Sequence, residues 1–191
     1  MLTHTLIFLI VTLGDLFALA LLLRFMLQLL RAPARNQISA FVAALTDFVV
    51  RPARRVIPGV AGLDLATLLL AWLTEMTQMW LVFQLKGDEP GSAVGVALIA
   101  LAALAAIQLV RLAVYVVMVA VVVQAVLSWV SPYSPLAPLL ANVTRPFVRP
   151  FQKLIPVIAN VDLSPLCVLI TCQLVLTVPL AWLGAQVRSM L

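Results

Sequence analysis

Four charged side chains interrupt long apolar stretches of the sequence and are the first candidates for chemistry: Asp15, Arg24, Glu75 and Arg111. Charge is costly in hydrocarbon, so a charged residue there usually has a function or a buried partner. Glu75 lies near the middle of its apolar run, whereas Arg24 is close enough to the end of its run to reach water. We expect an ion pair between Glu75 and Arg111. The alternative is a neutral Glu75 that hydrogen-bonds across to the second half of the chain.

Basic residues form the second group of candidates. Eight of the twelve Lys and Arg residues lie in the segments 31–55 and 145–153: Arg31, Arg35, Arg51, Arg54, Arg55, Arg145, Arg149 and Lys153. Since cytoplasmic loops are enriched in Lys and Arg, we expect both segments in the cytoplasm and both termini on the other side. A cationic surface of Arg51, Arg55, Arg149 and Lys153 at headgroup height would attract anionic lipid by about 1 kcal/mol per residue. Alternatively, these four residues only fix the topology.

Two acidic residues follow the basic segments, each directly before a new apolar run: Asp64 and Asp162. A carboxylate at the start of a helix accepts free backbone N–H groups and faces the positive end of the helix dipole. We interpret both residues as helix caps rather than as an ion site.

The residue types of common catalytic and metal sites are scarce. His4 is the only histidine, and the sequence has no H-E-x-x-H, no G-x-S-x-G and no glycine-rich phosphate loop. Cys167 and Cys172 lie five residues apart on one predicted helix and point to different faces, so we interpret them as small apolar fillers. The sequence therefore predicts no catalytic residue, no metal and no cofactor. Lipid explains the basic residues as well as nucleic acid does, so no nucleic-acid partner is expected.

Hydropathy predicts the elements that position these residues. The chain has 191 residues, of which 64% are hydrophobic and 10% are charged, and its mean hydropathy is +1.17. Soluble domains contain about 25% charged residues. Four runs are long enough to cross a bilayer as helices: 5–30, 65–85, 92–130 and 164–184. The sequence predicts an all-α, multi-pass membrane protein with about four spanning helices.

The third run is too long for a simple span. Residues 92–130 contain no proline or turn signal and would form a helix of roughly 58 Å, which tilt alone cannot fit into a ~30 Å core. It could extend beyond the lipid, contain a kink, or form an extra hairpin near Arg111.

A shift of 98 residues aligns "RPARRVIPGVAGLDL", residues 51–65, with "RPFQKLIPVIANVDL", residues 149–163. The sequence therefore predicts two tandem repeats, 1–86 and 103–191, joined by a connection and an extra apolar segment over 87–102. Each repeat is a spanning helix, a short amphipathic helix, a proline-basic loop and a second spanning helix. The short helices, capped by Asn36 and by Ser134 with Pro135, are too short to span and are expected in the membrane interface. The alternative is that they pack as ordinary core.

The repeat also relates polar residues within the spans. Gln173 is the counterpart of Glu75, which favours an inward-facing position at the repeat interface for both. Further hydrogen bonds between helices are expected from Gln28, Thr74, Gln108 and Gln124.

The doubled phrases resemble the YggT family of small bacterial inner-membrane proteins, called YlmG in Gram-positive bacteria. The resemblance is carried by "RPARRVIPGVAGLDLATLLL", "AVLSWVSPYSPLAPLL" and "RPFVRPFQKLIPVIANVDLSPL". It implies four spanning helices in two repeats and a role in osmotic-stress tolerance and in envelope or division processes, and in plastids in cytochrome assembly and nucleoid organisation. It implies no catalytic residues. The chain departs from an even duplication where Arg54 aligns with Gln152 and Gly62 with Asn160.

Two functions are therefore in competition. The first is a non-enzymatic inner-membrane scaffold or assembly factor that binds anionic lipid or partner membrane proteins through its cytoplasmic face. The second is a small oligomeric channel or transporter for ions or osmolytes, with a path lined by Glu75, Gln173 and Arg111. Neither half shows the Gly- or Pro-broken spanning helix that transporter sites usually contain, which favours the first function.

Overall fold

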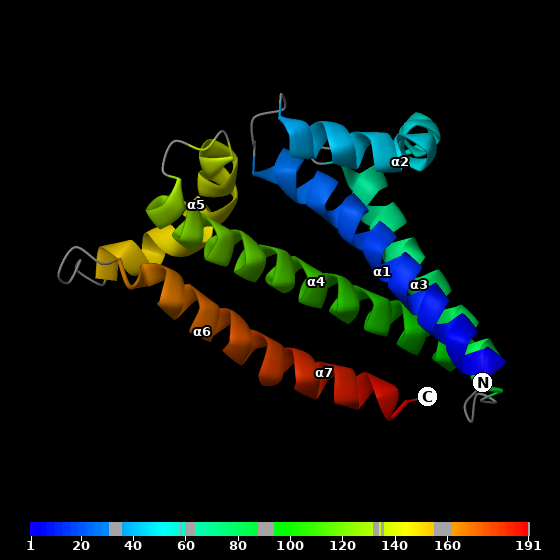
Figure 1. The fold of residues 1–191 in the computed structure, drawn as a ribbon. Coiled ribbons are helices and arrows are strands. Elements are labelled where there is room, and N and C mark those ends of the chain that lie inside the picture. Colours follow the sequence, from blue (N-terminus) through cyan, green and yellow to red (C-terminus); the bar gives the residue numbers. More distant parts are fainter. Residues whose placement is uncertain are drawn as a thin grey trace.

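The structure is a computed structural model that describes residues 1–30, 36–57, 59, 64–87, 94–131, 134, 136–154 and 162–190. Every regular element within these ranges is an α-helix (Figure 1). In chain order they are α1 (Leu2–Leu29), α2 (Gln37–Val56), α3 (Leu65–Lys86), α4 (Val94–Val130), α5 (Ala137–Leu154), α6 (Ser164–Thr177) and α7 (Pro179–Arg188).

Four helical segments are long and apolar enough to cross a membrane: Leu2–Leu29, Leu65–Lys86, Gly95–Val130 and Ser164–Arg188. Many of their large apolar side chains are exposed on the outside of the bundle, Phe8, Ile99 and Val119 among them. Such an outer surface is stable only where lipid covers it, since monomeric soluble proteins rarely expose large apolar patches. These features confirm the predicted multi-pass, all-helical membrane protein.

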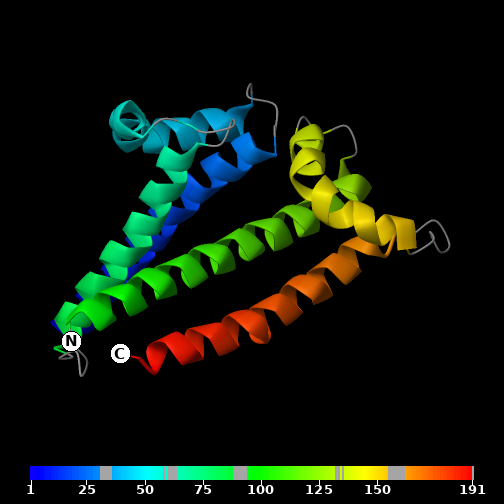
Figure 2. The same cartoon turned by 180° about the vertical axis from the view of Figure 1, so that it is seen from behind.

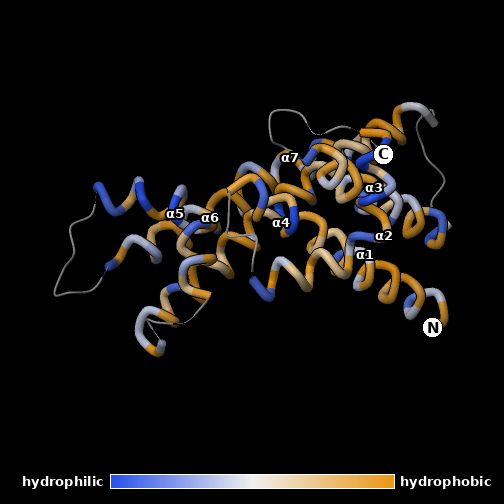
Figure 3. Tube along the Cα trace, turned by 90° about the horizontal axis from the view of Figure 1, so that it is seen from above, coloured by the Kyte–Doolittle hydropathy of each residue, from blue (hydrophilic) through white to orange (hydrophobic). Residues whose placement is uncertain are grey.

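The helices form two connected groups. α1 lies beside α3, and α4 lies beside α6 and α7, while α2 and α5 both lie at the end of the molecule opposite the two termini (Figures 1 and 2). Hydrophobic residues dominate the long helices, and hydrophilic stretches occur on α2 and α5 (Figure 3). The basic segments on α2 and α5 therefore share one end of the molecule.

α4 connects the two groups. It packs against α1, α3, α5, α6 and α7. One apolar cluster joins Leu21 and Met26 of α1 to Ala71 of α3 and to Val117 and Val121 of α4. A second cluster joins Leu27 of α1 to Ala120, Leu139 and Val143 of α4 and α5.

The long apolar run 92–130 forms one helix where it is described. α4 continues without a break for 37 residues from Val94 to Val130, so the structure has no hairpin near Arg111. Its length is about 55 Å at 1.5 Å per residue, which means that the helix extends beyond a single bilayer core.

The fourth span is broken, which corrects an expectation from the sequence. α6 ends at Thr177, and α7 begins at Pro179, with Val178 at φ −103° and ψ −77° between them. Pro179 has no N–H to donate to a carbonyl one turn earlier, and its ring disfavours the helical conformation at Val178. The argument that neither half contains a proline-broken span is therefore wrong for the second half.

The basic phrases are also helical rather than loops. α2 includes Arg51, Pro52 and Arg55, and α5 includes Arg149 and Lys153. Basic residues in the last turn of each helix lie near the negative end of the helix dipole. This interaction stabilises the C-terminal turns of α2 and α5. The residues Arg31, Arg35, Pro58, Gly62, Pro135, Pro156 and Asn160, which the sequence analysis also used, lie outside the described residues.

Candidate functional site

The closest polar contact between two spans joins α1 to α3. Gln78 Nε2 donates to Asp15 Oδ1 at 2.7 Å. A Cβ atom at Gly14 would lie 1.9 Å from Gln78 Oε1, so a side chain there would have to displace the Gln78 amide. Small residues permit this close approach of helices in membranes. Sequence reasoning missed Gln78, although it is three residues after Glu75 and so lies on the same helical face.

Glu75 is buried at this interface without a partner. Its exposed fraction is 0%, and neither carboxylate oxygen has a hydrogen-bond partner within the described residues. Its electrostatic neighbour is Asp15, which carries the same sign of charge. Oε1 of Gln78 is also buried and unbonded. The α1–α3 interface thus contains two carboxyl groups and one amide, with few hydrogen bonds among them.

The predicted ion pair between Glu75 and Arg111 is not formed. Arg111 Nη1 instead donates to Gln108 Oε1 on its own helix, at 3.5 Å. The two side chains cannot meet because Glu75 is enclosed between α3 and α1, whereas Arg111 lines a cleft between α3, α4 and α7. Gln173 does not match Glu75 either, because its side chain is exposed on α6. The three residues proposed to line one path are therefore not brought together.

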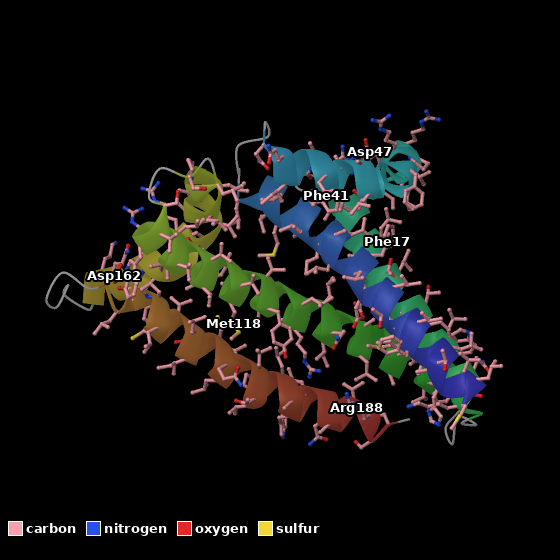
Figure 4. The ribbon with its side chains drawn as sticks, viewed as in Figure 1. Phe17, Phe41, Asp47, Met118, Asp162 and Arg188 are labelled. Atoms are coloured by element: carbon pink, nitrogen blue, oxygen red, sulfur yellow. The ribbon has the colours of Figure 1, made fainter. Side chains whose placement is uncertain are left out.

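Arg24 is central to a network between α1 and α2. Its Nη1 donates to Thr46 Oγ1 at 2.7 Å and to Asp47 Oδ1 at 2.8 Å, and Arg51 Nη2 contacts Asp47 Oδ2 at 2.7 Å. The hydrogen bond from Arg24, opposed by desolvation and aided by Arg51, lowers the pKa of Asp47 below its usual value. Sequence reasoning gave Arg24 little weight and missed Asp47, which Figure 4 labels on α2. The available signal was an acid four residues before Arg51.

Asp64 joins the end of α2 to the start of α3. It is the N-cap residue of α3, as the sequence predicts, and it accepts hydrogen bonds from the Thr67 backbone N–H at 3.4 Å and from the Thr67 hydroxyl. Arg54 Nε donates to Asp64 Oδ2 at 3.2 Å, and the Arg54 Nη2 group lies closer still. Desolvation raises the pKa of Asp64, but the bonds from Arg54 and Thr67 outweigh it and hold that pKa below its usual value.

Asp162 joins α5 to α6 in the same way, without an ion pair. Gln152 Nε2 donates to Asp162 Oδ2 at 2.8 Å, and the Ser164 backbone N–H donates to Oδ1 at 2.9 Å. Asp162 lies one residue before the N-cap position of α6, which is Leu163. Desolvation raises the pKa of Asp162, but the bonds from Ser164 and Gln152 bring it below its usual value. Figure 4 labels Asp162 at the start of α6.

A polar contact also joins α4 to α5. The Thr144 hydroxyl lies within hydrogen-bond reach of Gln124 Oε1 and donates to the Leu140 carbonyl at 2.9 Å. In the first half, the hydroxyl of Thr46 donates to the Val42 carbonyl at 2.7 Å. Both threonines are buried. Thr46 and Thr144, which lie 98 residues apart, thus each connect a short helix to a long one.

The four basic residues of the predicted cationic surface lie on α2 and α5 and are exposed: Arg51, Arg55, Arg149 and Lys153. Arg51 is engaged with Asp47 but is still 77% exposed. α2 also exposes Phe41 and Phe48, together with Leu45 between them. The spacing of these three residues places them on one stripe of the helix.

Metal-site chemistry has no support in the described part of the chain. No group of three or more His, Cys, Asp or Glu side chains is close enough there to hold a metal ion. Cys167 and Cys172 are free thiols.

Comparison with known proteins identifies similar sequences. The family model CCB3/YggT matches residues 3–85 and 103–183. The protein PA0392 of Pseudomonas aeruginosa is 48% identical over 69 residues, which are 36% of this chain and 35% of that protein. A protein encoded in the proC 3' region of Vibrio alginolyticus is 46% identical over 66 residues, 35% of this chain and 36% of its own.

YggT of Escherichia coli K12 is 35% identical over 81 residues, 42% of this chain and 43% of YggT. The alignments thus span less than half of the length of these relatives. No solved structure matches.

Proposed function

The chain belongs to the CCB3/YggT family, and from this premise we propose that it is a non-enzymatic scaffold or assembly factor of the bacterial inner membrane. In this proposal it supports envelope integrity and osmotic-stress tolerance, a role that the resemblance to YggT proteins implies. It binds anionic lipid or partner membrane proteins through the cytoplasmic end that carries α2 and α5.

The observation that carries the proposal is the exposed face of α2. Phe41, Leu45 and Phe48 form an apolar stripe, and Arg51 and Arg55 follow it on the same helix. An apolar stripe beside basic residues is typical of a helix that lies in the membrane interface and is attracted to anionic headgroups. α5, with Arg149 and Lys153, provides the second basic helix at the same end of the molecule (Figure 1).

Tandem duplication is part of this proposal. Contacts between equivalent positions recur 98 residues apart, between Arg54 and Asp64 and between Gln152 and Asp162. The two stretches matched by the family model support the same division into 1–86 and 103–191. Two copies of one interfacial unit would double the basic surface at one end.

Lipid preference tests the proposed surface. In nanodiscs of phosphatidylcholine and phosphatidylglycerol, the variant with Arg51, Arg55, Arg149 and Lys153 changed to Gln should retain less phosphatidylglycerol than the native chain does. The expected loss is a few kcal/mol in sum, since each base contributes about 1 kcal/mol. Arg145→Gln, compared with Arg149→Gln alone, controls for net charge, because Arg145 is also exposed on α5 but is not one of the four bases. Equal loss in both variants would show that charge, and not this surface, determines the preference.

Topology provides an independent test. Cysteines introduced at Ala53 on α2 and Phe151 on α5 should both be labelled from the cytoplasmic side of sealed vesicles, and neither from the other side. Opposite accessibility of the two sites would overturn the parallel repeats and the shared cytoplasmic face.

A second function is favoured by one structural feature. The fourth span is broken at Val178 and Pro179, and such broken helices occur at transporter sites. An oligomeric channel or transporter would use the buried Glu75 as its intramembrane polar group. Flux of ions or osmolytes in proteoliposomes under an osmotic gradient, abolished by Glu75→Gln, would favour this function. Bilayers without flux, together with a defined partner captured by crosslinking, would favour the scaffold.

A further inference from the structure

A cleft of about 550 Å³ lies between α3, α4 and α7, with Val11 of α1 at its edge, near the end of the molecule that carries the termini. Its polar lining comes from three helices: Gln78 and Lys86 on α3, Gln108 and Arg111 on α4, and Arg188 on α7. Lys86 and Arg188 are the last residues of their helices, and Figure 4 labels Arg188 at the end of α7. The cleft therefore extends from the end of the bundle toward its interior.

Among the residues that the structure describes, the lining of this cleft carries one sign of charge. Lys86, Arg111 and Arg188 contribute to it, and no described Asp or Glu does. Within the described ranges none of the three bases takes part in an ion pair, and the one hydrogen bond among them is the 3.5 Å contact from Arg111 to Gln108. Three cations that face one space repel each other and favour an anion between them.

The position of Arg111 favours a bound ligand over a purely structural role for the three bases. Lys86 and Arg188 lie in the last turns of α3 and α7, where a cation stabilises the helix dipole without any ligand. Arg111 lies well inside α4, far from either helix end. A charged side chain in such a position usually has a function or a partner, and its planar guanidinium matches the oxygen geometry of phosphate.

We propose that the cleft between α3, α4 and α7 binds a phosphate group through Arg111, Lys86 and Arg188. Gln108 offers its amide N–H groups to the ester or hydroxyl oxygens that accompany a phosphate in a lipid headgroup, whereas Gln78 already donates to Asp15. A membrane supplies this chemistry as an anionic phospholipid such as phosphatidylglycerol, and solution supplies it as free phosphate. The cleft lies at the end of the molecule opposite Arg51, Arg55, Arg149 and Lys153, so this site is independent of the proposed lipid surface.

The glycine at position 184 permits a steric test that removes no charge. Gly184 is buried and lines the cleft, yet a Cβ atom there would meet no atom within 4 Å. A side chain there therefore starts into the open space of the cleft, since its Cβ atom meets no protein atom. Gly95 is a matched control, because it also lies in a helix with nothing within 4 Å of a Cβ atom but does not line this cleft.

The experiment has two arms with the full chain in nanodiscs. In the first, inorganic phosphate is titrated calorimetrically into protein in phosphatidylcholine. In the second, protein from nanodiscs of phosphatidylcholine and phosphatidylglycerol is examined by native mass spectrometry for retained phosphatidylglycerol. Arg111→Gln should weaken binding about tenfold, the equivalent of losing one charge-assisted contact. Gly184→Leu should reduce binding similarly, and Gly95→Leu and the charge-matched Arg145→Gln should leave it unchanged.

The pattern across variants decides the outcome. Loss in the lipid arm alone supports the site and identifies a headgroup as its ligand, whereas loss in the phosphate arm alone supports a soluble anion. Binding in neither arm, or equal binding by the native chain, Arg111→Gln and Gly184→Leu in both arms, overturns the proposal. Equal loss in Gly95→Leu and Gly184→Leu also overturns it. Circular dichroism and the thermal midpoint of each variant verify that it is folded.

Discussion

Between α1 and α3, Gly14 and Asp15 meet Gln78 across a close polar contact, whereas the residues 98 positions later are Leu112, Ala113 and Leu176. Leu112 and Ala113 pack against the main apolar cluster, and Leu176 is buried. The first pair of spans is thus held at one place by hydrogen bonding, and the corresponding positions of the second pair are apolar.

The same difference recurs at the short helices. Arg54 forms an ion pair with Asp64 in the first half, where Gln152 forms a neutral-to-charged hydrogen bond with Asp162 in the second. Arg24 binds Thr46 and Asp47, whereas Gln124 contacts Thr144. The threonines and the residues of the α2–α3 and α5–α6 contacts lie at matching positions, whereas Arg24 and Gln124 do not: the residue 98 positions after Arg24 is Val122. Ionic contacts are an additional property of the first unit, whose stability should depend more on pH and salt.

Gly14→Leu should cause the largest loss of stability among these variants. The new side chain would enter space occupied by Gln78 Oε1, 1.9 Å from the Cβ position. Overpacking of this kind costs about 3 kcal/mol. The free energy of unfolding, measured in detergent, should fall accordingly, and Gln78→Ala in the same chain should recover part of the loss. Gly95→Leu, where a Cβ atom meets nothing within 4 Å, is the control. Equal losses at Gly14 and Gly95 would contradict the close contact.

Asp64 and Asp162, which connect a short helix to the following span, should contribute differently to the free energy of unfolding. Asp64→Ala removes an N-cap and a bond to a cation, for about 2 kcal/mol, whereas Asp162→Ala removes hydrogen bonds with neutral partners, for about 1 kcal/mol. Thermal unfolding of both variants in one detergent measures the difference. A larger loss at Asp162 would mean that the ion pair with Arg54 does not strengthen the first link.

Arg54→Gln should replace the ion pair at Asp64 with a hydrogen bond of the kind that Gln152 makes to Asp162. The expected destabilisation is about 0.5 kcal/mol, since Arg54 is partly exposed and water screens the pair. The pKa of Asp64 is held below its usual value of 3.8, so its contacts stabilise the fold above that pH and are lost as pH falls below it. The difference between Arg54→Gln and the native chain should therefore disappear in acid. A difference that grows below pH 3.8 would contradict this sign.

Glu75→Gln should have the smallest effect. The native carboxyl has no hydrogen-bond partner or cation within the described residues, and an isolated buried charge is too costly to persist. The amide has nearly the same shape and no charge, so the free energy of unfolding should change by less than about 0.5 kcal/mol. Thermal unfolding with and without Arg111→Gln tests the result. A large loss restored by the second substitution would show that the two residues pair after all.

Hydropathy predicted the spanning helices well. The four spans, the short helices and the cap at Asp64 follow from local rules that act within a few residues. Pro179 was as visible in the sequence as Pro58, but it lies inside an apolar run, and its effect on that run was overlooked. The basic phrases were assigned to loops because of their prolines, although Pro52 and Pro150 lie inside helices.

The contacts between helices could not be predicted in the same way. Whether Glu75 meets Arg111 depends on the rotation of α3 and α4 about their axes, which is set by packing over the whole length of each helix. The pair Arg24 and Asp47 is separated by 23 residues and depends on how α2 folds back over α1. Such contacts require the positions of entire helices, and hydropathy gives only their lengths.

The length of α4 has a mechanical consequence. A continuous helix of about 55 Å is nearly twice as long as a ~30 Å hydrocarbon layer is thick. It is a rigid rod that meets α3 toward one end and α5 toward the other. Stretching a membrane thins it, and a rod that is too long responds by tilting further. We expect the tilt of α4 to increase as the bilayer becomes thinner. This tilt would move the surface formed by α2 and α5 relative to the lipid.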